Sequence, residues 1–240
     1  MGLYTGADYP VAAEIEALHT SELASFTQCG TWGSAAQRAA IAATAREARS
    51  AAGLQEAVSD KRDGDTAKLP DAALQLARDV ALDGTTIDRE YCRQVQAEGV
   101  TEGAYVEIVG VVSRLVNLDV FARGIGLAPR PLGETNDSNK PTFERPSEAV
   151  DEGFFTASVP SAPEGGALAE SLYGKNPAGN IIRTLSLVPE EAHRLIALVT
   201  NQYFPAAQLM DLTATGIHAL SRAQIEIVAT KVSEHNKCFY

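Results

Sequence analysis

Helical spacing of apolar residues, with no competing strand pattern, is the feature that most constrains how this chain can fold. The stretch that begins at Thr101 repeats apolar residues three and four positions apart, on one expected helix face: Tyr105, Ile108, Val109, Val112, Leu115, Val116 and Val120. No sustained alternation of apolar and polar residues occurs, and no Asn-Gly hairpin turn. Alanine is abundant and costs little entropy in a helix. We therefore expect an all-α fold.

Caps and helix breakers divide the pattern into separate elements. Ser34 is a plausible N-cap for a long alanine-rich helix, and Thr86 is one for a short helix that ends at Gly99. The expected helices span residues 11–26, 34–59, 70–82, 87–97, 101–126, 166–173, 181–187 and 189–204, and residues 205–220 form a further apolar, helical segment.

The last expected helix begins at Ser221. Ser221 and Gln224 fit a capping box, in which each side chain bonds the backbone of the other residue. After it, apolar residues recur at helical spacing, and we expect this face to be core: Ile225, Val228, Ala229 and Val232.

Prolines punctuate residues 128–165, whose centre reads GETNDSNKPTFERP. This composition is typical of a linker or of a long surface excursion. We predict a helical domain over residues 1–127, a Pro-rich linker over 128–153, and a second helical domain over 154–240. A two-fold plan, with 34–126 and 154–240 as related halves, is compatible with this order.

Composition argues against several classes of function. The net charge is −11 and the sequence pI is near 4.8, so binding to nucleic acid is not expected. No stretch approaches the roughly 18 apolar residues of a membrane span, and no secretory signal is visible, so we expect a cytoplasmic protein. Three cysteines make no secreted disulfide framework, and four scattered histidines make no metal site. We expect no metal and no cofactor.

The last helix carries the residues best suited to chemistry. Steps of four positions link Glu226, Thr230, Glu234 and Cys238, which keeps them broadly on one side of a helix. A carboxylate on this stripe could relay a proton to or from the thiol. The thiol needs such help, because the thiolate is the nucleophile and a free cysteine is mostly protonated at neutral pH.

The sequence around these residues resembles a known redox motif. The run S-R-x-Q-x-E-x-x-A-x-x-V-S-x-x-N-x-C-F-Y at residues 221–240 is similar to the motif helix of the AhpD-like, carboxymuconolactone decarboxylase-like family. Residues 173–199 resemble the first half of that family's domain, and residues 66–126 resemble its second half. The resemblance covers most of the chain, and residues 34–126 would be a domain copy that lacks the cysteine pair.

The resemblance implies an AhpD-like helical bundle that assembles as a homo-oligomer. It also implies a thiol-dependent peroxidase that reduces a hydroperoxide and is recycled by a dithiol reductant. Cys238 matches the first cysteine of the family's C-x-x-C pair, and Glu226 matches its relay carboxylate. Two alternatives stay open: a γ-lactone decarboxylase of the carboxymuconolactone type, and a non-catalytic structural or interaction protein.

The second cysteine of the motif would directly follow Tyr240. We therefore expect the 240 residues to show little or no peroxidase turnover. One hypothesis is that a selenocysteine codon, UGA, follows Tyr240; a fragment is the alternative.

Other chemically active residues have simpler interpretations. We expect His235 to lie at the surface, and Cys29 and Cys92 to take no part in catalysis. Glu107, inside an apolar helix, is either a boundary residue or a buried carboxylate that faces a pocket.

Overall fold

All regular structure in the described residues is helical. The computed structural model describes residues 2–60, 68–175, 177–204, 208, 211, 213–214 and 219–238. Among them, β pairing is limited to two isolated bridges, Gln28 with Asn136 and Val150 with Ser158. The all-α prediction is confirmed.

The chain separates into two compact units, Met1–Leu195 (unit 1) and Ile196–Tyr240 (unit 2). Unit 1 contains α1 (Ala13–Ser25), α2 (Ala35–Ala51), α3 (Asp71–Leu82), the 3-10 turn η1 (Gly84–Thr86), α4 (Arg89–Ala97), α5 (Glu102–Gly124), α6 (Gly166–Tyr173), α7 (Asn180–Arg183) and the first half of α8 (Pro189–Gln202). Unit 2 contains the rest of α8 and α9 (Arg222–His235).

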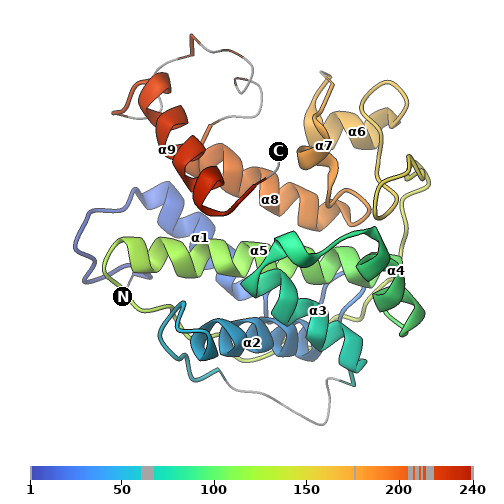
Figure 1. Ribbon diagram of the computed structural model, residues 1–240, viewed down its shortest axis with the longest axis horizontal. Helices are drawn as coiled ribbons and strands as arrows, with labels where there is room; N and C mark the ends of the chain where they lie inside the picture. Colours follow the sequence, from blue (N-terminus) through green and yellow to red (C-terminus); the bar gives the residue numbers. More distant parts are fainter. Residues whose placement is uncertain are drawn as a thin grey trace. The chain divides into compact units, whose positions relative to one another are not determined.

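Helix α5 is the centre of unit 1. Helices α1, α2 and α3 all pack against it, and α2 also packs against α3 (Figure 1). Its burial extends beyond the predicted face, because its other sides are covered as well: Val106, Glu107, Gly110, Val111, Arg114 and Leu118 are buried. Val120, which we placed on the apolar face, is instead 52% exposed. A helix that is apolar nearly all round is one that neighbours enclose.

Most expected helix starts agree with the structure. Ser34 makes a full capping box with Gln37, and the Thr101 hydroxyl accepts from the backbone of Ala104. Helix α4 is present, but its predicted N-cap was wrong: Asp88 is the N-cap and accepts from the Tyr91 amide at 2.8 Å, while Thr86 lies in the preceding turn.

Two helices are shorter than predicted. Helix α2 ends at Ala51 rather than near residue 59, because Gly53 takes a left-handed conformation (φ +70°) and the Leu54 amide bonds back to the Arg49 carbonyl at 2.9 Å. Helix α7 covers four residues, Asn180–Arg183, where we expected one over 181–187. The helical segment predicted over 205–220 falls mostly outside the described residues.

Residues 128–165 are a surface excursion rather than a free linker. Hydrogen bonds attach them to unit 1: the Asn136 amide donates to the Thr27 carbonyl at 2.8 Å, and the Ala157 amide donates to Glu102 at 2.6 Å. Unit 1 contains residues from both sides of this segment. The domains predicted over 1–127 and 154–240 stay a prediction. In the described part of the chain, every helix is too short or too polar to cross a membrane.

Candidate functional site

The structure places Glu226 in a defined polar setting within unit 2. Helix α9 begins with the predicted capping box of Ser221 and Gln224. One turn further, Glu226 Oε1 accepts a hydrogen bond from the Tyr203 hydroxyl at 2.6 Å and one from Arg222 Nε at 2.7 Å. Burial and the Glu226 carboxylate raise the pKa of Tyr203 above its usual value, so this phenol stays protonated and donates. Glu226 is thus held in one orientation.

Cys238 does not lie on the helical stripe that the sequence predicted. Helix α9 ends at His235, and Lys237 takes a left-handed conformation (φ +52°). The Lys237 amide then bonds the Glu234 carbonyl at 3.1 Å, and the Cys238 amide bonds the Ser233 carbonyl at 2.9 Å. This is a Schellman cap, which turns the chain off the helix axis. Cys238 is exposed beyond it, while Glu226 is bonded to Tyr203 and Arg222.

The expected core face of α9 is only partly buried. Ile225 is buried, but Val228 is 57% exposed and Val232 is 54% exposed. The core prediction was therefore wrong for these two valines, because apolar spacing shows which face can be buried and not whether a neighbour covers it. His235 is exposed, as expected for a surface histidine.

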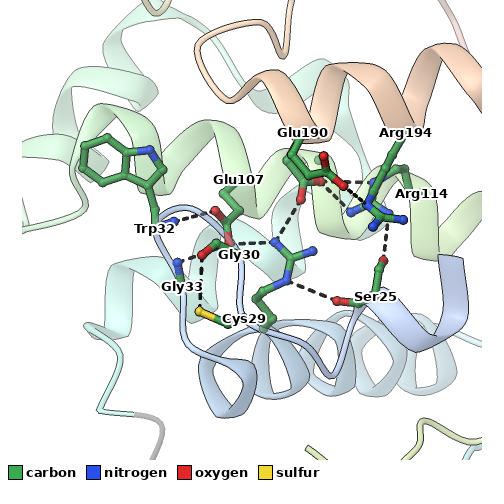
Figure 2. A network of polar contacts seen from close by, with 12 residues as sticks. Ser25, Cys29, Gly30, Trp32, Gly33, Glu107, Arg114, Glu190 and Arg194 are labelled. Atoms are coloured by element: carbon green, nitrogen blue, oxygen red, sulfur yellow. Dashed lines mark hydrogen bonds and ion pairs between the residues drawn. The ribbon is translucent and has the colours of Figure 1, made fainter. Parts of the chain in front are cut away.

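A second site, which the sequence indicated only at one residue, lies inside unit 1. Glu107 is a buried carboxylate, 2% exposed, and accepts from the backbone amides of Trp32 at 2.7 Å and Gly33 at 3.2 Å (Figure 2). It also accepts from Arg38 Nη1 at 2.7 Å. Of the two interpretations of Glu107, the buried carboxylate is confirmed. It faces a pocket of about 250 Å³ whose wall includes Phe143.

Glu191, from the start of α8, joins two buried arginines. Its Oε1 accepts from Arg38 Nη1 at 2.9 Å, and its Oε2 accepts from Arg114 Nη2 at 2.6 Å. Arg114 also donates to Ser25 Oγ at 3.2 Å and stacks over the Phe26 ring, 5.0 Å from its centroid. Its guanidinium is fully buried.

Glu22 extends this cluster to the surface. It pairs with Arg114 on one side and with Arg194 Nη1, at 3.0 Å, on the other. Arg194 Nε in turn pairs with the exposed Glu190 at 2.8 Å (Figure 2). Five buried residues and the partly buried Arg194 balance in charge, with Arg38, Arg114 and Arg194 against Glu22, Glu107 and Glu191. We call these six residues the ionic cluster.

The ionic cluster shifts the pKa values of Glu191 and Arg38. Burial alone would raise the pKa of Glu191, but Arg114 and Arg38 outweigh it and hold the pKa below its usual value. Burial would likewise lower the pKa of Arg38, but Glu191 and Glu107 raise it above its already high value. At neutral pH Glu191 is therefore ionised and Arg38 is protonated.

The remaining thiols are poor nucleophiles. Burial and the nearby Glu107 charge raise the pKa of Cys29, and Arg38 only partly opposes them. Cys92 is buried, and its Sγ lies 3.4 Å from the Phe155 carbonyl oxygen, to which it donates. The Cys29 thiol is therefore mostly protonated at neutral pH, and Cys92 is shielded from solvent. That these cysteines take no part in catalysis stays a prediction.

Charged residues inside apolar helices were the available signal for the ionic cluster. Arg38 interrupts an alanine-rich helix, and Arg114 interrupts the long apolar helix α5. Asp119 is another charged residue inside an apolar helix. It accepts hydrogen bonds from Arg46 Nε at 2.9 Å and from Arg46 Nη2 at 2.7 Å. The sequence analysis singled out Glu107 alone, because these arginines have partners that are distant in sequence.

Neither region is arranged as a metal site. Within the described ranges, no group of three or more His, Cys, Asp or Glu side chains is placed to hold a metal ion. The comparisons give no relative: no protein-family model, no curated protein and no solved structure matches the chain.

Proposed function

We propose that the chain is a thiol-dependent peroxidase of the AhpD-like type, with Cys238 as a redox thiol and Glu226 as its relay carboxylate. Two observations support this best: an exposed cysteine, Cys238, follows α9 directly, and Tyr203 and Arg222 hold the Glu226 carboxylate in place on the same helix. The proposed substrate is a hydroperoxide, the proposed reductant is a dithiol, and no nucleic acid takes part. A homo-oligomer in the cytoplasm is the proposed setting.

The proposed step is a two-electron oxidation of sulfur. The Cys238 thiolate attacks the terminal oxygen of the hydroperoxide, the O–O bond breaks, and the alkoxide leaves and takes up a proton as an alcohol. A thiol of the reductant then attacks the sulfenic sulfur and releases water. Its second thiol displaces the Cys238 thiolate and leaves the reductant as a disulfide. We expect this recycling to be slow in the 240 residues, because they hold no second cysteine of a C-x-x-C pair. In this proposal Glu226 supplies or takes up the proton that these steps need through a chain of water molecules, because twelve residues separate it from Cys238.

Trapping of sulfenic acid tests the proposal on the chain as it exists. After brief exposure to an alkyl hydroperoxide, a dimedone probe should label Cys238 well before Cys29 or Cys92, and Cys238→Ser should abolish that label. Glu226→Gln should slow labelling and change its pH profile. Glu234→Gln is the matched control, because Glu234 lies on the same helix and pairs at the surface with Lys231.

Two outcomes would contradict the proposal. Equal labelling of all three cysteines would show that Cys238 has no special reactivity. A rate and pH profile unchanged by Glu226→Gln would remove the relay. Either result would favour the non-catalytic alternative, whereas conversion of a γ-carboxylactone with loss of CO₂ would favour the decarboxylase.

A further inference from the structure

A polar pocket of about 290 Å³ borders the ionic cluster in unit 1. Its wall combines the loop after α1, which supplies Cys29 and Thr31, with Arg38 of α2 and Thr142 of the surface excursion. Arg194 of α8 completes it. The pocket thus gathers side chains from four segments that are far apart in sequence.

Arg38 brings an unused hydrogen-bond donor to this pocket. Its side chain is 3% exposed. Nη1 donates to Glu107 and Glu191, and Nε donates to the Ser25 carbonyl at 3.4 Å, so the guanidinium plane is fixed. Among the described residues, nothing pairs with Nη2. A buried guanidinium held in this way presents its last amino group without further loss of side-chain entropy.

Arg194, which is 23% exposed, is also held by two carboxylates. Nη1 pairs with Glu22 and Nε pairs with Glu190, which leaves Nη2 without a partner in the described part of the chain. Arg38 and Arg194 therefore line the same pocket, and the Nη2 of each guanidinium is available to donate a hydrogen bond.

Charge and shape limit the ligand. The ionic cluster is balanced and Glu190 adds one negative charge at the pocket wall, so the repulsion of an anionic ligand grows with its charge and is smallest for a single negative charge. A single carboxylate is planar and has two acceptor oxygens, which matches two guanidinium donors. We propose that this pocket binds the carboxylate of a small organic monoacid. The site is independent of Cys238 and of the proposed peroxidase.

Cys29 makes the proposal measurable, because its thiol lines the pocket and is partly accessible. The full chain is labelled with N-ethylmaleimide at pH 8, and modification is followed at each cysteine by peptide mass spectrometry. The probe is sodium propionate. Sodium chloride controls for ionic strength, and propionamide is the uncharged isostere. Cys238, in unit 2, is the internal reference.

Propionate at millimolar concentration should slow the labelling of Cys29 several-fold and leave Cys238 unchanged, while propionamide and chloride should do neither. Arg194→Gln should weaken this protection about tenfold, as expected for the loss of a charged hydrogen-bond donor. Arg93→Gln, at an exposed arginine outside the pocket, should leave it intact.

Several results would overturn the proposal. Equal protection by propionamide would show a site selective for size alone, and stronger protection by inorganic phosphate would show a general anion site. Absence of protection by propionate in the wild-type chain would exclude a carboxylate site, whether or not the variants fold.

Discussion

Helices α2 and α9 begin and end in the same way, yet they are buried very differently. Each starts with a Ser-x-x-Gln capping box, and each ends in a Schellman cap, around Gly53 in α2 and Lys237 in α9. Ile41 and Val228 occupy the same position after their N-cap serines, but Ile41 is 3% exposed and Val228 is 57% exposed.

The difference shows that the ends of a helix are set locally and its burial is not. Neighbouring side chains and backbone groups complete both caps within a few residues of sequence. Burial of α2 comes instead from α3 and α5, which pack against it. The carboxylates follow the same rule: Glu107 is enclosed in the ionic cluster, whereas Glu226 has its two polar partners at a partly exposed position.

We expect the largest loss of stability from a substitution that removes the Glu191 carboxylate, which joins Arg38 and Arg114. Glu191→Gln should destabilise unit 1 by about 3–5 kcal/mol, because Arg38 and Arg114 stay buried with one negative charge fewer between them. Urea unfolding measures this loss. Glu190→Gln is the matched control, since Glu190 is adjacent and exposed, and should cost less than about 1 kcal/mol. Similar losses in both variants would show that the cluster is not a buried network.

The two equivalent helix positions should respond unequally. Ile41→Ala should cost about 2–5 kcal/mol, because it leaves a cavity under α2. Val228→Ala should change the free energy of unfolding by no more than about 0.5 kcal/mol. Urea unfolding of both variants at two protein concentrations measures these changes. A large, concentration-dependent loss for Val228→Ala would show that another copy of the chain covers α9.

A buried histidine should make unit 1 sensitive to acid. Burial lowers the pKa of His19 to about 4, below the value near 6.5 that the unfolded chain has. Between these values the unfolded chain binds more protons, so stability is complete above pH 6.5 and falls by up to about 3 kcal/mol as the pH drops to 4. This loss of stability between pH 6.5 and pH 4 should be smaller in His19→Gln and unchanged in His235→Gln. Urea unfolding at several pH values measures it. An unchanged slope in His19→Gln would mean that other groups carry the effect.

The smallest effect concerns the shared caps. Ser34→Ala should cost about 1 kcal/mol in global unfolding, because α2 is part of the core of unit 1. Ser221→Ala should instead speed amide hydrogen exchange in the first turn of α9 and leave the unfolding of unit 1 unchanged. Loss of global stability from Ser221→Ala would contradict the contrast between the two helices.

The all-α fold class and most helix starts could be predicted from the sequence. They depend on the spacing of apolar residues and on capping residues only a few positions away. The starts of α2, α5 and α9 follow Ser34, Thr101 and Ser221 as expected. The end of α2 was also encoded locally, in Gly53, and the prediction passed over that signal. The end of α9 was harder to foresee, because lysine rarely adopts the left-handed conformation that Lys237 has.

By itself, the sequence determined that the chain is helical, where most of its helices start, and that Glu226 lies on the last of them. The tertiary structure alone decided which charged residues meet. Glu22, Arg114 and Glu191 are far apart in the chain, and only the packing of α1, α5 and α8 brings them into contact. It also decided that Val228 is exposed and Glu107 enclosed. Burial is a property of neighbours in space, and a pattern along one helix cannot specify which neighbours the folded chain will supply.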